Sequence, residues 1–153
     1  HKNLQTLIQA FESLNPPDHH LVLVGSYPKI QLKGKIHLLG KVDQKDLPCL
    51  YAAATALIFP SLYEGFGLPP LEAMASGCPV IASNAASITE VCEDAALYFS
   101  PKNSEELKSC MQELLANPDL SKNLIQKGFS RSQLFLWEKT QKELRELLLE
   151  DVF

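Results

Sequence analysis

Short apolar runs that alternate with helix-like segments constrain the fold of this chain more than any other feature. Four β-type runs occupy residues 21–24, 36–42, 56–59 and 79–83, and a weaker one follows at 96–99. Before, between and after them, apolar residues recur every three or four positions, as they do on one face of a helix. Such alternation is typical of an α/β domain with a parallel sheet. We therefore expect one Rossmann-like domain, a doubly wound sheet of about five parallel strands.

The ends of these runs predict where a ligand binds, because open parallel sheets bind ligands at the carboxyl ends of their strands. Gly25 follows the first run, Gly40 interrupts the second, and Glu64 comes shortly after the third. Each glycine taken singly is also explained as an ordinary loop residue. Three strand ends of this kind together predict a nucleotide cleft.

The stretch 63–76, YEGFGLPPLEAMAS, contains the strongest candidate site. Glu64 and Glu72 stand eight positions apart, and Gly65 and Gly67 between them allow backbone N–H groups to approach an anion closely. Two prolines then fit a helix start. This places Glu72 in or near the first helical turn, where the peptide dipoles also attract a phosphate.

A carboxylate and a phosphate compete for that space unless a hydroxylated ligand separates them. A nucleotide does so, since its ribose hydroxyls suit the carboxylate and its phosphates suit the amides. The alternative for each acid is structural: Glu72 as an ordinary helix-start acid and Glu64 as a solvated turn residue. A capping box does not explain Glu72, because Pro69 stands where the box needs Ser or Thr.

The longer segment EGFGLPPLEAMASGCPVIAS resembles the acid, x7, acid motif of the family-four retaining glycosyltransferases, which have the GT-B fold. HKNLQTLIQAF, LVLVG, HLLGKV and FLWEKT resemble successive landmarks of that family's C-terminal, nucleotide-binding domain. The resemblance covers almost the whole chain. It implies that residues 1–153 are a single donor-nucleotide-binding domain of a longer parent, lacking its first strand and the parent's N-terminal acceptor domain.

The resemblance also implies a reaction, retaining and metal-independent sugar transfer from a UDP- or GDP-sugar, with no further cofactor. Glu64 would be the catalytic acid, acting by positioning and charge stabilisation, and Glu72 would bind the ribose hydroxyls. Lys2 and the turn amides would bind the diphosphate, with the base near Val42. His1 departs from the family, which often has arginine there. The implied donor-binding residues are Lys2, Val42, Gly65, Phe66, Gly67, Leu68 and Glu72.

Two other function classes stay open at this point. One is a non-catalytic module that binds a nucleotide sugar or a protein. The other is a different GT-B-fold enzyme, such as a sugar-nucleotide epimerase or a glycan phosphorylase. The epimerases lack the EGFGLPPLEAMA motif. The phosphorylases need a lysine that binds pyridoxal phosphate, and no lysine occupies the helix after the EGFG turn. The acceptor, a glycan, lipid or small molecule, would bind the missing N-terminal domain.

Composition limits the classes of binding partner and the cellular compartment that we expect for this chain. A net charge of -4 gives no reason to expect nucleic acid, and no apolar run reaches the ~18 residues of a membrane span. The adjacent His19 and His20 make a poor joint metal-ligand pair in an extended segment. Cys49 and Cys78 are expected as buried thiols of a reducing compartment. The expected location is cytoplasmic, or peripheral at the inner membrane through the missing domain.

Overall fold

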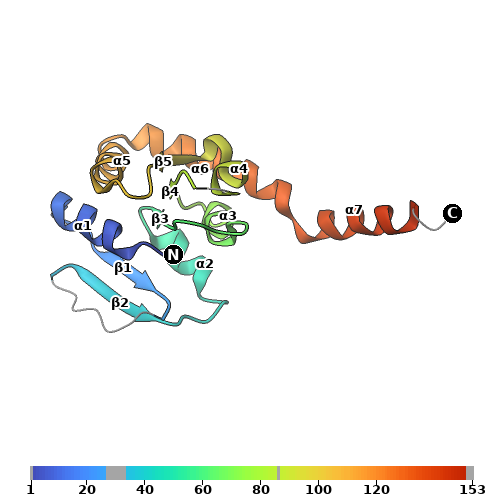
Figure 1. Ribbon diagram of the computed structural model, residues 1–153, viewed down its shortest axis with the longest axis horizontal. Coiled ribbons are helices and arrows are strands. Elements are labelled where there is room, and N and C mark those ends of the chain that lie inside the picture. Colours follow the sequence, from blue (N-terminus) through green and yellow to red (C-terminus); the bar gives the residue numbers. More distant parts are fainter. Residues whose placement is uncertain (1, 27–33, 86, 151–153) are drawn as a thin grey trace.

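The computed structural model describes residues 2–26, 34–85 and 87–150, so His1 and most of the polar connection at 26–35 lie outside the described residues. Strands and helices alternate along the described chain, as expected (Figure 1). The strands are β1 (Leu21–Val24), β2 (Ile36–Gly40), β3 (Leu57–Phe59), β4 (Val80–Ser83) and β5 (Ala96–Phe99). The α-helices are α1 (Leu4–Leu14), α2 (Leu47–Ala53), α3 (Leu68–Ala75), α4 (Ser87–Cys92), α5 (Ser104–Ala116), α6 (Pro118–Ser132) and α7 (Trp137–Glu150). Two short 3₁₀ helices are η1 (Glu93–Ala95) and η2 (Gln133–Phe135).

All the described strand pairs are parallel, which confirms the expected fold class. The strands form a pair, β1 with β2, and a triplet in the order β3, β4, β5. We expected one continuous sheet, and the structure instead leaves β1 and β3 unpaired with each other. The strand facing the gap, β3, has only three residues, and a cavity described below lies between it and β1.

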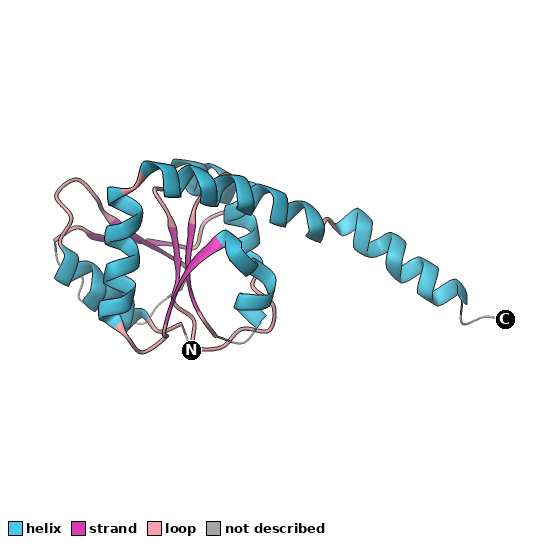
Figure 2. Cartoon of the chain, turned by 90° about the horizontal axis from the view of Figure 1, so that it is seen from above, coloured by secondary structure: helices cyan, strands magenta, loops and turns pink. Residues whose placement is uncertain are grey.

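Helices cover the strands on both sides, as Figure 2 shows. Helix α1 packs on α5, and α3 packs on α6. The central strand β4 separates two hydrophobic clusters: Ile81 belongs to the one with α1 and α5, whereas Val80 and Ala82 belong to the one with α3 and α4. All three side chains are at most 1% exposed. This burial on both faces is what a doubly wound sheet requires.

The expectation that Cys49 is buried was wrong, because this residue is exposed on α2. Strand β1 also differs from β4, since Val22 is 48% exposed and β1 is therefore not buried on both faces. Gly128 of α6 is a close-packing position. A Cβ there would lie 2.9 Å from Met74 Cγ on α3. Cys78 is buried as expected, and burial raises the pKa of its thiol to about 11, so it is protonated at neutral pH.

The last helix, α7, extends away from the rest of the molecule (Figure 1). None of the helices in the described part of the chain combines the length and hydropathy of a bilayer-crossing segment.

Candidate functional site

Asn3 brings the start of the chain to the carboxyl ends of the strands. Its side-chain amide donates to the carbonyl of Pro60 at 3.0 Å and to that of Pro101, and its Oδ1 accepts from Thr6 Oγ1 at 2.8 Å. Pro60 directly follows β3, and Pro101 comes two residues after β5. The neighbouring Lys2 therefore lies at the edge of the sheet where a ligand was predicted.

Glu64 is half-buried just past the end of β3, held by three serines from different parts of the chain. Ser61 Oγ donates to Glu64 Oε1 at 2.8 Å, and Ser87 Oγ donates to the Glu64 carbonyl at 2.8 Å. Ser83, at the end of β4, donates in turn to the carbonyl of Ser61. Since Ser61 and Ser83 are 3% and 0% exposed, the carboxylate is attached to a rigid support. Ser87, the first residue of α4, thereby fixes this turn.

The turn after Glu64 ends at Gly67, the N-cap of α3, whose φ of 115° and ψ of 42° favour glycine. Four backbone positions at a helix start lack an intrahelical acceptor. Here they are residues 67–70, and Pro69 and Pro70 have no N–H. Gly67 and Leu68 are therefore the amide donors that the helix start offers to an anion. Gly65, in contrast, does not have a positive φ.

Glu72 is the fifth residue of α3, just after the first turn, and so lies near the helix start as the sequence predicted. Its Oε2 accepts a hydrogen bond from the Tyr51 hydroxyl of α2 at 3.3 Å. The pKa of Tyr51 rises to about 12, chiefly because the phenol is partly buried and then because of the Glu72 charge. At neutral pH the phenol therefore stays protonated and orients an otherwise exposed carboxylate.

These groups meet at a cavity of about 720 Å³ between β1 and β3. Three of the predicted site residues line it: Lys2, Glu64 and Glu72. The lining is otherwise largely apolar and includes Tyr51 and Ser61. The remaining predicted residues do not line it. Gly65, Phe66, Gly67 and Leu68 form the adjacent turn and helix start, and Val42 is in the loop after β2.

Sequence reasoning missed the supporting residues of this site, namely Asn3, Tyr51, Ser61, Ser83 and Ser87. Asn3 and Ser61 had a usable signal, since polar residues beside strand ends are candidates for the same site. Tyr51 had none, because it occupies an ordinary apolar position in the helix pattern of α2.

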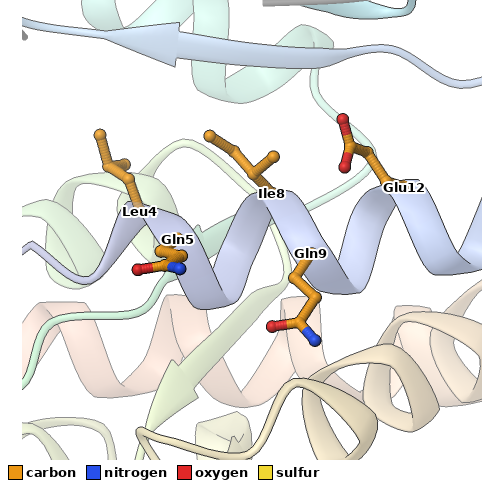
Figure 3. A pocket seen from close by; sticks show the side chains of 5 residues that line it. All are labelled: Leu4, Gln5, Ile8, Gln9 and Glu12. Carbon is orange, nitrogen blue, oxygen red and sulfur yellow. The ribbon is translucent and has the colours of Figure 1, made fainter. Parts of the chain in front are cut away.

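A second hollow, of about 530 Å³, lies along α1. Figure 3 shows Leu4, Ile8 and Glu12 pointing to one side of the helix and Gln5 and Gln9 to another. Among the described residues, α1 alone lines this hollow. Because no second element of the described chain contributes a polar group to it, we do not assign it a function.

His20 has a partner that the sequence did not indicate. Its Nδ1 lies 2.8 Å from Nε2 of His37 in β2. The described residues contain no group of three or more His, Cys, Asp or Glu side chains that could hold a metal ion. Independence from metal therefore stays a prediction about the reaction.

Residues 1–131 match the family described as glycosyl transferases group 1. This match covers most of the chain, so the chain belongs to the group 1 glycosyltransferases. The expected family is thereby confirmed.

Named relatives support the same assignment. The O-antigen chain mannosyltransferase B of Escherichia coli is 41% identical over 106 residues, which cover 69% of this chain and 28% of that protein. A serotype-specific mannosyltransferase, WbdA of Escherichia coli, is 31% identical over 156 residues, covering 91% of this chain and 19% of that protein. The chain thus spans less than a third of the length of these relatives.

Solved structures share the fold. The sucrose-phosphate synthase of Thermosynechococcus elongatus has a TM-score of 0.86 at 31% identity, over 97% of this chain and 42% of that one. The C-terminal domain of a group 1 glycosyl transferase from Francisella tularensis has a TM-score of 0.76 at 28% identity, over 88% of this chain and 79% of that one. The HepE protein of Anabaena, solved with UDP-glucose, has a TM-score of 0.87 over 97% of this chain and 45% of that one. At 24% identity, it shows the fold alone.

Proposed function

We propose that the cavity between β1 and β3 binds a nucleoside-diphosphate sugar, UDP- or GDP-linked, for retaining and metal-independent transfer of the sugar. The observation that supports this most is the meeting of Lys2, Glu64 and Glu72 around one cavity at the carboxyl ends of the strands. Its volume of about 720 Å³ also lies in the ordinary range of small-molecule sites.

Each group has a distinct task in this proposal. Lys2 and the amides of Gly67 and Leu68 stabilise the diphosphate leaving group as negative charge grows on it. Glu72, oriented by Tyr51, accepts hydrogen bonds from the ribose hydroxyls.

Glu64 faces the transferred sugar. Held by its serines, it stabilises the positive charge that develops on the ring, without acting as a nucleophile. Gly65 and Phe66 complete the turn around the phosphates, and the base lies towards Val42.

The acceptor, a glycan, a lipid or a small molecule, binds in this proposal to a part of the protein outside these 153 residues. The chain covers 28% and 19% of the lengths of the two mannosyltransferase relatives, so a protein of their length would have room for such a part. All four cysteines are free, which suits a reducing compartment. We therefore place the protein in the cytoplasm, either free or peripheral at the inner membrane through the acceptor-binding part.

The test is titration calorimetry of UDP and GDP with wild type, Glu72→Ala and Glu72→Gln. We expect Glu72→Ala to weaken binding of the preferred nucleotide by roughly 1–3 kcal/mol, the scale of a lost hydrogen bond to a charged group. Glu12→Ala, which removes an exposed acid from the surface of α1, is the matched control and should bind like wild type. Equal affinity in all variants would remove Glu72 from the site. Binding without transfer by the longer protein would favour a nucleotide-sugar-binding module instead.

A further inference from the structure

The C-terminal end of α6 is tied to the helix that packs behind the donor-site turn. Arg131 of α6 donates from Nε to the carbonyl of Val91 at 2.8 Å and from Nη2 to that of Glu90 at 2.7 Å. Its Nη2 also lies 3.0 Å from Glu93 Oε1, and its side chain is only 15% exposed. Since carbonyls at a helix end lack intrahelical donors, Arg131 caps α4.

The Arg131 guanidinium is also connected to the turn through two aromatic rings, those of Phe135 and Phe66. Arg131 Cζ lies 4.9 Å from the centroid of the Phe135 ring, within the range of a cation–π contact. Phe135 meets Phe66 edge to face, with centroids 5.7 Å apart and an interplanar angle of 82°. This geometry is favoured by the ring quadrupoles. Phe66 is the middle residue of the GFG turn and is itself 45% exposed, so Phe135 supports one side of it.

A second route of contacts from Arg131 to the turn passes through α4. A Cβ on Gly67 would lie 3.9 Å from Val91 Cγ1, so the Val91 side chain lies beside the N-cap of α3. Arg131 holds the carbonyl of that same valine. The two routes therefore end on consecutive residues of the turn, Phe66 and Gly67.

We propose that Arg131 is a positioning residue, which holds the turn 65–68 in the shape that receives the donor diphosphate, through Phe135 on Phe66 and through Val91 on Gly67. The proposal rests on the proposed donor site. Arginine suits this role because its planar fork can serve two carbonyls and an aromatic face at once. A lysine, a point charge on a flexible stem, would keep the ion pair with Glu93 and lose the rest.

Lys127 offers a matched control on the same helix. One turn before Arg131, it forms an ion pair with Asp94 of η1, with Nζ 2.8 Å from Oδ2. Both cations therefore join α6 to η1, and the proposal gives only Arg131 a connection to the turn.

The experiment measures amide hydrogen exchange at Leu71 and Glu72 well below the melting temperature, in wild type, Arg131→Gln, Arg131→Lys and Lys127→Gln. These two amides bond to the carbonyls of residues 67 and 68 in the first turn of α3, so their exchange reports on the turn. We expect this exchange to be about 2–10-fold faster in Arg131→Gln, the effect of losing a cation–π contact and its hydrogen bonds. Arg131→Lys should restore little of this protection. Lys127→Gln should match wild type. Equal protection of the turn in Arg131→Gln and Lys127→Gln would overturn the proposal.

A second pair of variants tests the aromatic route if Arg131→Gln does not fold. Phe135→Leu removes the ring, whereas Phe135→Tyr keeps it. We expect faster exchange in the turn for the leucine variant and recovery of protection for the tyrosine variant. Uniform acceleration over the whole chain in Phe135→Leu, as global destabilisation produces, would count against positioning.

Nucleotide affinity separates this proposal from the proposed function. UDP or GDP affinity should fall about 2–5-fold in Arg131→Gln and Phe135→Leu, as expected from contacts of this strength. If wild type binds neither nucleotide, the proposed function fails while the exchange measurement still decides the role of Arg131. If wild type binds and these variants bind equally well, Arg131 does not position the donor site.

Discussion

Glu64 owes its orientation to Ser61, Ser83 and Ser87 rather than to its immediate helix or strand. The Ser61 hydroxyl is almost fully buried and donates to the carboxylate, so its removal leaves Glu64 without a fixed donor. We expect Ser61→Ala to lower the free energy of unfolding by about 1–2 kcal/mol, the range for a partly buried hydrogen bond to a charged group. Urea denaturation measures this.

The control for Ser61→Ala is Ser109→Ala, which removes an exposed hydroxyl bonded to a helix carbonyl of α5. It should change stability by less than about 0.5 kcal/mol, as surface substitutions usually do. A double-mutant cycle of Ser61→Ala with Glu64→Gln isolates the interaction itself. Strictly additive effects would show that the two side chains do not act together.

At the scale of elements, the start of α3 depends on Gly67 much more than on Gly65. Gly67 has a φ of 115°, a conformation that side chains rarely adopt, although a Cβ would meet only ordinary contacts there. At Gly65 nothing lies within 4 Å of a built Cβ, and its φ is not positive. We expect Gly67→Ala to cost roughly 1–3 kcal/mol of stability through backbone strain.

Gly65→Ala is the comparison, and it should stay within about 0.5 kcal/mol of wild type by urea denaturation. Nucleotide affinity should follow the same order, since strain at Gly67 displaces the amides of the helix start. An equal loss of stability in both variants would show that the positive φ of Gly67 is not what makes this turn sensitive to substitution.

Much of the element order was predictable from the sequence, because it follows from local periodicity and from residues that mark helix boundaries. Pro69 marks the start of α3, and Gly77 follows its end. The β3 run, expected at 56–59, is found at Leu57–Phe59, and Asn103 caps α5 through its side chain as a helix-start residue should. The local pattern does not predict the close packing at Gly128, because the residue packed against it, Met74, lies in another helix.

The support of the site was not predictable, because its contacts join residues far apart in the chain. Asn3 bonds across 57 and 98 positions, and Arg131 across 40 and 41. No periodicity encodes such pairs. The motif therefore indicated Glu64 and Glu72, whereas the structure was needed to find Tyr51, Ser61 and Arg131 behind them.

At the scale of the whole molecule, the cavity proposed for the donor lies between β1 and β3, and nothing in the described residues provides a second reactant site facing it. Positioning two reactants against each other can account for ~7–11 kcal/mol of a reaction barrier. A chain that spans 28% of a mannosyltransferase relative would need the rest of such a protein to supply that positioning.

We therefore expect the 153-residue chain to bind donor nucleotide without transferring sugar, and a longer protein containing it to transfer sugar without added metal. The measurement is a screen of both proteins with UDP-, GDP- and ADP-sugars, each repeated with EDTA and with Glu64→Gln. In the proposed function Glu64 stabilises charge on the reacting sugar, so the variant should lose transfer by about 10²–10³-fold, as with the removal of one electrostatic donor, while nucleotide affinity stays near wild type. Undiminished transfer by Glu64→Gln would exclude Glu64 from the mechanism. Loss of transfer in EDTA, restored by a divalent cation, would replace the metal-free scheme with one in which the cation neutralises the diphosphate.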